Sequence, residues 1–245
     1  MMVTDLDGTL LRDDRRVSPV DLKTLEDLGR KKIWRVLATG RSLYSLDRVI
    51  PPDFPIDYVI FSCGAGLYDW QKKRIISSTG LNNGQILSAT SVLLKNRIPF
   101  MVHFPIPDNH HFYFWGEEKP ETDFSRRLRL YPECRYPLRL PVRIEESSQI
   151  VAIFPADKRK AFQRIRTAII KELAQRVSVI MATSPIDRRS LWLEIFAENV
   201  SKGAAAGALA AELGIDRNSV RALGNDFNDR DLLEWAGESF VVRNA

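Results

Sequence analysis

Residues 1–9 read MMVTDLDGT, a short apolar run that passes directly into two acids placed two positions apart. We interpret residues 1–4 as a strand with Asp5 and Asp7 at its carboxyl end. Two carboxylates this close repel each other unless a cation or a proton relieves the charge. A hard cation such as Mg²⁺ takes oxygen ligands and substrate phosphate oxygens, so the stretch predicts a cation site at the end of the first strand.

The rest of both ends of the chain alternates strand and helix patterns. Ser18 and Pro19 are typical of a helix N-cap and first helical position. Alternating strands and helices indicate a parallel sheet with helices on both faces. The strands expected in this sheet, after the first, are residues 33–38, 58–61, 191–196, 220–223 and 240–242, and later helices are expected after residue 41, at 201–213 and up to residue 235.

The middle of the chain is richer in proline, arginine and aromatic residues. Its patterns predict helices at 86–95, 122–130 and 158–173 and strands at 100–104, 111–115, 149–154 and 177–181. The predicted fold class is therefore α/β, a doubly wound, Rossmann-like parallel-sheet core with an inserted α/β cap domain. We expect the core to comprise residues 1–81 and 186–245, and the cap residues 82–185.

Composition excludes several classes of protein. With 44% hydrophobic and 27% charged residues among 245, the chain is ordinary for a globular protein. It has no apolar run near the ~18 residues of a membrane span and no signal-peptide pattern. Its two cysteines, Cys63 and Cys134, are far apart in sequence, so we expect no disulfide framework and a cytoplasmic location. The cysteines and histidines also show no spacing typical of zinc ligands.

Three more polar segments follow the expected strands, where ligands bind in such a sheet. Thr39-Gly40-Arg41 offers a hydroxyl and a guanidinium suited to phosphate. Lys202 opens a helix whose positive dipole end favours an anion. The turn at residues 224–229, GNDFND, supplies further oxygen ligands.

These four segments, in this order, resemble the four motifs of the haloacid dehalogenase superfamily. The position of the insert, after Cys63-Gly64-Ala65, resembles the Cof-type, sugar-phosphatase-like branch with a large α/β cap. Residues 193–195 and 200–203, LEI and VSKG, are similar to that branch's stretch around its lysine. Both ends are short beside the family pattern, as in a truncated chain or one with a disordered tail.

The resemblance implies a role for each matching residue. Asp5 would attack phosphorus and form an aspartyl-phosphate, and Asp7 would act as general acid and base. Thr39 and Lys202 would hold the phosphoryl oxygens. The other implied substrate-binding residues are Gly8, Gly40, Arg41 and Asn228, and the implied Mg²⁺ ligands are Asp5, the Asp7 main chain, Asn225, Asp226 and Asp229.

Two positions depart from the family pattern. Asn225 stands where the first aspartate of the last motif is expected, with Asp226 next to it, and either could be the metal ligand. Cys63 stands where many relatives carry asparagine, and we interpret it as a small buried residue rather than a nucleophile.

The expected function is that of a Mg²⁺-dependent phosphatase acting on small phosphorylated metabolites, with sugar phosphates first among them. The alternatives are a phosphotransferase or phosphomutase using the same aspartyl-phosphate, and a non-catalytic anion- or nucleic-acid-binding protein. A net charge of +5 raises the last alternative, but residues 82–185 alone carry +6 and the remainder −1. We therefore expect no nucleic-acid or membrane partner, and a cationic cap that favours an anionic substrate; oligomeric state stays open.

Cap side chains leave two interpretations. All three histidines, His103, His110 and His111, lie in the cap, beside the aromatic run at 112–115. They could form a specificity surface, but alternating buried aromatics on a strand are favoured. The basic run at 158–160 is interpreted as a solvated helix start.

Overall fold

The strand predicted at the N-terminus forms β1 (Met2–Asp5), which lies inside a seven-stranded sheet of the computed structural model. The structure describes residues 1–12, 14–120, 122–174 and 176–243. Contacts divide the chain into two units, Met1–Ser78 with Val200–Ala245, and Thr79–Asn199.

The sheet of the first unit has the order β15-β14-β1-β2-β3-β4-β5. Its first five strands are parallel, and β4 and β5 extend the edge as an antiparallel hairpin. The neighbours of β1 come from opposite ends of the chain, which makes this the topological switch point where such sheets bind ligands. The strands are β2 (Arg35–Ala38), β3 (Tyr58–Phe61), β4 (Gly66–Asp69), β5 (Arg74–Ser78), β14 (Arg221–Gly224) and β15 (Glu238–Val241).

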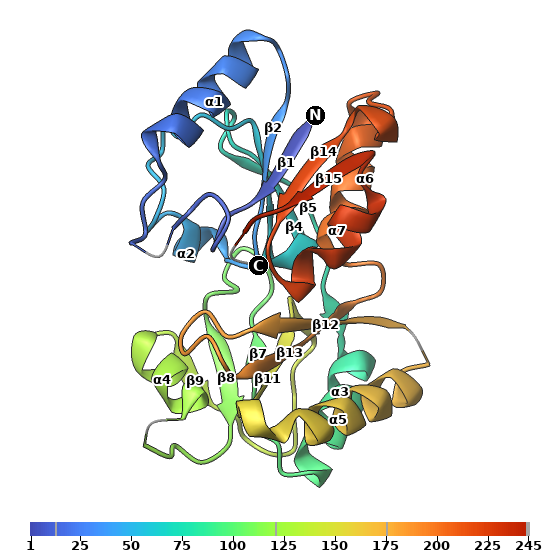
Figure 1. Cartoon of the computed structure of the whole chain (residues 1–245). Helices are drawn as coiled ribbons and strands as arrows, with labels where there is room; N and C mark the ends of the chain where they lie inside the picture. Colours follow the sequence, from blue (N-terminus) through green and yellow to red (C-terminus); the bar gives the residue numbers. More distant parts are fainter. Residues whose placement is uncertain (13, 121, 175, 244–245) are drawn as a thin grey trace. The chain divides into compact units, whose positions relative to one another are not determined.

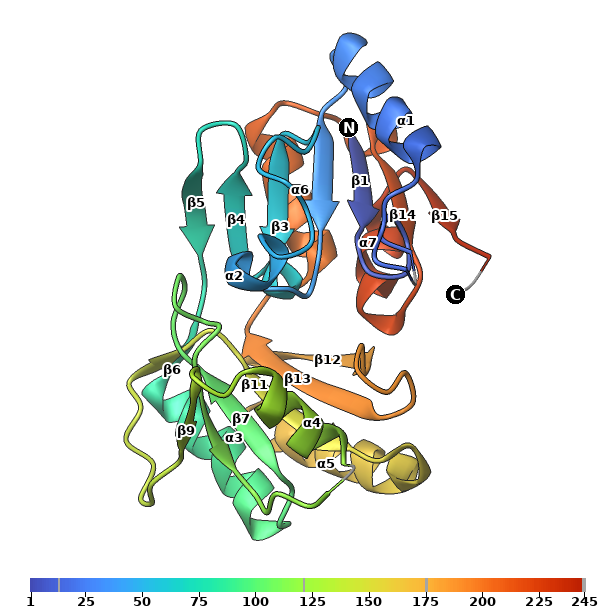
Figure 2. The same cartoon turned by 90° about the vertical axis from the view of Figure 1, so that its left-hand side faces the viewer.

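Helices cover both faces of this sheet, which confirms the predicted fold class. Figure 2 shows α1 (Pro19–Arg30) and α2 (Leu43–Leu46) in front of the sheet, with α6 (Lys202–Glu212) and α7 (Arg230–Trp235) behind it. Ser18 caps α1 as predicted, because its hydroxyl accepts a hydrogen bond from the Asp21 amide. The face towards α6 and α7 is apolar: the buried core there comprises Val3, Val36, Ile60, Ala206, Leu209, Ala222 and Leu232, among others.

The second unit has a sheet of its own, in the order β12-β13-β11-β7-β8-β9. Its neighbours are antiparallel, except that β8 and β9 run parallel. Within this unit, α3 and α5 lie on one face and α4 on the other (Figure 1), where Phe124 and Leu128 pack on Val151 and Trp192. The elements are α3 (Asn83–Lys95), β7 (Phe100–His103), β8 (Phe112–Trp115), α4 (Asp123–Leu130), β9 (Arg135–Pro137), β11 (Ile150–Phe154), α5 (Arg159–Glu172), β12 (Val177–Thr183) and β13 (Leu191–Ala197), with a separate small ribbon of β6 (Leu81–Asn82) and β10 (Glu146–Ser147).

One strand was assigned to the wrong sheet. β13 was expected in the core, but Ile195 pairs with Ile150 of β11 and with Val179 of β12. The second boundary therefore falls between Asn199 and Val200, not at residue 186, and the first between Ser78 and Thr79. All seven residues of β13 are buried, and a strand buried on both faces has a continuous apolar sequence whichever sheet it joins. The sequence pattern therefore could not distinguish the two sheets.

A buried histidine on β7 predicts a pH-dependent stability. Burial, with the nearby Arg127 cation, lowers the pKa of His103 to about 3, against about 6.5 in an unfolded chain. The unfolded state therefore binds a proton that the folded state does not, and the free energy of unfolding falls as pH drops below about 6.5. Between pH 7 and pH 5, we expect His103 to lower the free energy of unfolding of the wild type by about 1–2 kcal/mol. His103→Gln should lack this decrease, which urea unfolding at the two pH values measures. A pH dependence as steep in the variant as in the wild type would contradict this assignment.

Candidate active site

The predicted site residues meet at the carboxyl ends of β1 and β14. These strands are parallel neighbours, with Thr4 opposite Leu223, so Asp5 and Gly224 end the strands side by side. The loop after β1 and the turn after β14 are therefore brought together, although more than 200 residues separate them in sequence. This arrangement is the one that the motif order predicted.

The centre of the site is a buried cation between two carboxylates. Lys202 Nζ lies 2.7 Å from Asp5 Oδ1 and 2.6 Å from Asp229 Oδ1, and the Lys202 side chain is wholly buried. Burial opposes the charge of Lys202, but Asp5 and Asp229 outweigh it and hold the pKa of Lys202 above its usual value. The ammonium therefore stays charged and fixes the orientation of both carboxylates.

Lys202 owes its position to the close approach of two segments. Ser201 caps α6 by accepting a hydrogen bond from the Ala204 amide, which makes Lys202 the first residue of the helix. The turn that ends β3 touches this helix start, because a Cβ on Gly64 would lie 2.2 Å from the Ser201 carbonyl oxygen. Gly64 also has φ of +103°, so a side chain here would both strain the backbone and displace Lys202.

The two carboxylate oxygens of Asp5 have different surroundings. Burial raises the pKa of Asp5 to about 6, against the attraction of Lys202, and Asp229 and Asp7 add to the rise. Its Oδ1 accepts from Lys202, whereas Oδ2 is buried and has no hydrogen-bond partner in the described part of the chain. A buried carboxylate oxygen without a partner is costly, which fits a site that a cation or a substrate completes.

Asp229, which the sequence predicted as a metal ligand, contacts protein donors through both of its carboxylate oxygens. Its Oδ2 accepts from the main-chain amides of Asn225 and Asp226, at 2.8 and 3.1 Å, and its Oδ1 accepts from Lys202. Both oxygens are thus engaged with protein donors. Asp229 shapes the turn and holds Lys202, and direct metal ligation by it, the expected role, is disfavoured by these contacts.

In the turn after β14, Asn225 and Asp226, the two alternative metal ligands, make different contacts. The Asp226 carboxylate caps the short helix η4 (Phe227–Asp229) by accepting from the Asp229 amide. Asn225 instead reaches the loop after β1: Thr9 Oγ1 donates to Asn225 Oδ1 at 3.4 Å, and a Cβ on Gly8 would lie 2.4 Å from Asn225 Nδ2. The geometry therefore favours Asn225 as the oxygen donor towards the Asp5 loop.

Asn225→Asp tests this assignment. A carboxylate here would add one negative charge to an oxygen-ligand set, so we expect about tenfold tighter Mg²⁺ binding. Isothermal titration with Mg²⁺ measures the change, and Asn218→Asp, the same change on an exposed residue of the same unit, is the matched control. Equal Mg²⁺ affinity in wild type and Asn225→Asp would exclude Asn225 as a ligand.

Asp7 is held by Arg41. Arg41 Nε and Nη2 donate to the two Asp7 carboxylate oxygens at 2.8 and 2.7 Å, and Nη1 donates to Ser45 Oγ at 3.0 Å. We predicted Arg41 as a substrate-binding residue, but its fork points to Asp7. A bidentate guanidinium fixes the plane of the carboxylate, so Arg41 is a positioning residue for Asp7.

Replacing Arg41 by lysine tests that role. Lysine keeps the positive charge but loses the planar fork, so we expect kcat to fall about 10- to 100-fold with a much smaller change in KM. Steady-state kinetics on an aryl phosphate separates the two parameters. A rise in KM with unchanged kcat would instead make Arg41 a substrate ligand.

The remaining predicted residues line the same ends of strands. Thr39 is fully buried, and its Oγ1 accepts from the Arg41 amide at 3.1 Å. Gly40 lies against Cys63, whose Sγ would be 3.3 Å from a Cβ there, and Asn228 Nδ2 lies 3.9 Å from that sulfur. Cys63 is buried as predicted and raises the pKa of Lys202 by its proximity; sequence reasoning did not count it among the site residues.

The donors gathered here are suited to a hard divalent cation. Asp5 offers a carboxylate group, Asn225 an amide oxygen and Asp7 a main-chain carbonyl, and oxygen donors of these kinds are the ligands that Mg²⁺ takes. We therefore judge that the residues present fit Mg²⁺.

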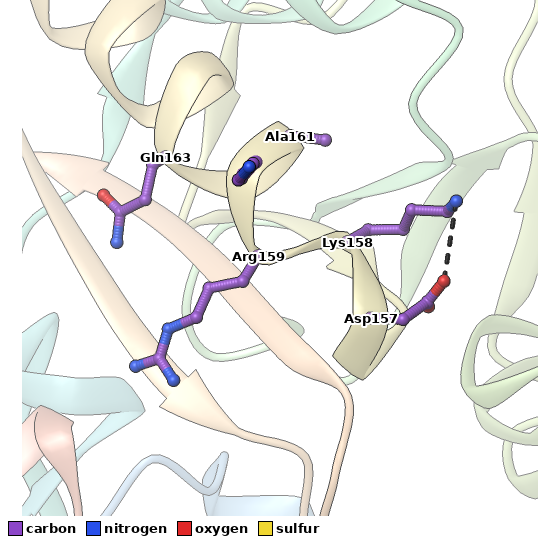
Figure 3. A pocket seen from close by; sticks show the side chains of 6 residues that line it. Asp157, Lys158, Arg159, Ala161 and Gln163 are labelled. Atoms are coloured by element: carbon purple, nitrogen blue, oxygen red, sulfur yellow. Dashed lines mark ion pairs between the residues drawn. The ribbon is translucent and has the colours of Figure 1, made fainter.

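The basic run of the second unit forms no comparable site. Figure 3 shows Lys158 and Arg159 pointing in different directions from the start of α5, with Lys158 paired to Asp157 at 3.5 Å. The residues lining this surface hollow are Asp157, Lys158, Arg159, Lys160, Ala161 and Gln163. The run agrees with its interpretation as a solvated helix start.

Comparison with known proteins identifies the family of the chain. The model of the haloacid dehalogenase-like hydrolases matches residues 2–245. The chain belongs to this family. The predicted resemblance is confirmed: the protein is a hydrolase of this family, and its curated relatives are named as phosphatases.

Two curated relatives cover nearly the whole chain. It is 26% identical to the putative phosphatase YxeH of Bacillus subtilis, over 100% of this chain and 87% of that protein. It is 25% identical to an HMP-PP phosphatase of Klebsiella pneumoniae, over 98% and 83%.

Solved structures show the same fold. A haloacid dehalogenase-like hydrolase from B. subtilis matches with a TM-score of 0.73 at 21% identity, over 100% of this chain and 90% of that chain. A subclass IIB sugar phosphatase of the superfamily matches with a TM-score of 0.73 at 14% identity, over 98% and 86%. Among the described residues, none of the helices has the length and apolarity needed to cross a membrane.

Proposed function

We propose that this enzyme is a Mg²⁺-dependent phosphatase of small phosphorylated metabolites, sugar phosphates or related phosphomonoesters, that works through an aspartyl-phosphate. The observation that carries the proposal is that the two carboxylate oxygens of Asp5 differ in their contacts. Oδ1 accepts a hydrogen bond from Lys202, whereas the buried Oδ2 has no hydrogen-bond partner among the described residues. A nucleophilic carboxylate needs a fixed orientation and one oxygen atom that is available to attack.

In the first half-reaction, Asp5 Oδ2 attacks phosphorus and the bond to the leaving oxygen breaks. Asp7 gives a proton to that oxygen and is left as the carboxylate whose plane the Arg41 guanidinium fixes. Lys202 keeps Asp5 in place and, with the N-terminus of α6, favours the negative charge of the phosphoryl group. The Thr39 hydroxyl, Gly8, Gly40 and Asn228 complete the proposed phosphoryl-binding set.

In the second half-reaction, Asp7 takes a proton from water, which attacks the aspartyl-phosphate and releases inorganic phosphate. Asp5 is thereby restored as a carboxylate. Mg²⁺, held by Asp5, the Asp7 carbonyl and Asn225, would supply charge neutralisation at the phosphoryl oxygens.

We assign catalysis to the first unit and substrate selection to the second. The support for this division is that all the proposed catalytic residues lie in the first unit, while the second unit, residues 79–199, carries a net charge of +5. A basic surface favours anionic metabolites. We further propose a cytoplasmic location, for which the support is that the two buried cysteines form no disulfide.

The experiment is phosphate release from an aryl phosphate with Mg²⁺ and with EDTA, followed by a panel of sugar phosphates, glycerates and nucleotides. HMP-PP, the compound in the name of one relative, belongs in the panel. We expect Mg²⁺-dependent turnover with phosphate released to water. Phosphate recovered on a second sugar would identify a mutase, and salt-sensitive nucleic-acid binding without turnover would overturn the proposal.

A further inference from the structure

A second group of metal-ligating side chains lies in the second unit, which holds none of the residues assigned to catalysis. One ligand atom each from His110, His111 and Cys134 lies within 4.8 Å of the others. We propose that these three side chains bind a divalent transition-metal ion of the zinc class.

The fold, rather than sequence spacing, brings the three residues together. His110 and His111 belong to the turn between β7 and β8, and Cys134 immediately precedes β9. β8 and β9 are parallel neighbours, and the Phe112 amide donates to the Cys134 carbonyl oxygen at 2.9 Å. The backbone beside His111 is therefore tied to the backbone of Cys134, which holds the cluster on a rigid edge of the sheet.

The spacing is within reach of tetrahedral coordination. Three atoms no more than 4.8 Å apart share a point about 2.8 Å from each, whereas Zn–N and Zn–S bonds are about 2.0–2.1 and 2.3 Å. Small side-chain rotations close that gap without moving the sheet. Three protein ligands leave a fourth position for water or an exogenous ligand.

The surroundings hold these side chains close together. The His110 and His111 ring centroids lie 4.2 Å apart, so the two rings can reach the same ion. The Tyr136 hydroxyl lies 3.4 Å from His111 Nδ1, as an outer hydrogen bond that orients a ligating ring. Cys134 is buried, and the Phe104 ring is 5.6 Å from His111, so water is partly excluded.

Ligand chemistry separates this cluster from the proposed Mg²⁺ site. Thiolate and imidazole select zinc, copper, nickel or cobalt, whereas Mg²⁺ takes oxygen ligands. On binding, a sulfur–metal bond forms and the Cys134 thiol proton passes to solvent. Bound metal would tie the β7–β8 turn to the start of β9.

The test is a Co²⁺ titration of the full-length chain with Mg²⁺ in excess, followed by displacement with Zn²⁺. We expect one Co²⁺ per chain, tetrahedral visible bands and a thiolate-to-cobalt charge-transfer band in the near ultraviolet. Cys134→Ser is expected to lose that band and to weaken binding at least about 100-fold, because ligand loss exceeds the effect of losing an outer contact. Cys63→Ser, the matched change at the other cysteine, is expected to keep the band.

His111→Asn provides a second, half-exposed variant should Cys134→Ser fold poorly, as judged by circular dichroism. It is expected to weaken Co²⁺ binding to the same extent while the fold is retained. Absence of the charge-transfer band in wild type, its persistence in Cys134→Ser, or unchanged affinity in a folded His111→Asn overturns the proposal. No substrate is used, so the result is independent of the phosphatase assignment.

Discussion

Asp5→Asn is expected to abolish hydrolysis while stabilising the metal-free protein. Activity on an aryl phosphate should fall at least about a thousandfold, because the amide cannot attack phosphorus. Stability should rise, because the wild type buries two carboxylates, Asp5 and Asp229, against the single ammonium of Lys202. Asp5→Asn leaves one carboxylate, Asp229, beside the ammonium of Lys202, so the buried charges balance.

The stability gain should depend on pH in a defined direction. Burial raises the pKa of Asp5 to about 6, so the folded state holds a proton that the unfolded state has lost between about pH 4 and 6. The contribution of Asp5 is therefore most favourable at low pH and is lost as pH rises through 6. In EDTA, we expect the free energy of unfolding of Asp5→Asn to be higher than that of the wild type. The difference should be about 1–3 kcal/mol at pH 8 and smaller at pH 5.

Urea unfolding at both pH values and phosphate release at saturating Mg²⁺ are the two measurements. Asp53→Asn, the same change at an exposed position of the same unit, is the control and should leave both nearly unchanged. Full activity in Asp5→Asn would refute the aspartyl-phosphate mechanism. A less stable variant at pH 8 would refute the electrostatic account of the buried triad.

Lys202→Met is expected to lose both activity and stability. Removing the ammonium leaves Asp5 and Asp229 buried without their cation, and breaking a buried ion pair in this way costs about 3–5 kcal/mol. That is a large share of the stability of an ordinary domain. Thermal unfolding should show the loss directly, whereas Lys23→Met on the exposed side of α1 should not.

A combined variant separates charge burial from packing. Adding Asp5→Asn and Asp229→Asn to Lys202→Met removes the uncompensated charges, so we expect much of the lost stability to return without any activity. If stability does not return, the role of Lys202 is packing rather than charge. If Lys202→Met alone is as stable as wild type, the triad is not the anchor of this site.

The sequence was sufficient to predict the core of the fold and which polar segments meet at the ends of its strands. Strand periodicity and helix caps such as Ser18 are local signals, so β1, β3, α1 and most elements of the second unit were anticipated within a few residues. Parallel strands must place their carboxyl ends at one edge, so Asp5, Thr39 and the turn after β14 were predicted to converge. Lys202 followed from the motif order.

Five other strands carried no such signal. β4, β5, β6, β9 and β10 read GLYD, RIISS, LN, RYP and ES, and polar residues, glycine or proline interrupt the apolar run that would distinguish them from loops. The sheet membership of β13 was mispredicted for a related reason: pairing between strands is a non-local choice, and a strand buried on both faces fits several neighbours.

Local sequence thus determined which residues form strands and helices, and the order of the motifs determined which of them meet. Only the tertiary structure decided what each side chain contacts: Arg41 holds Asp7, Asp229 shapes a turn, and Asn225 rather than Asp226 reaches the Asp5 loop. It alone also brought Cys134 to His110 and His111. These contacts depend on strand register and turn geometry between distant segments, which residue types and spacing along the chain do not encode.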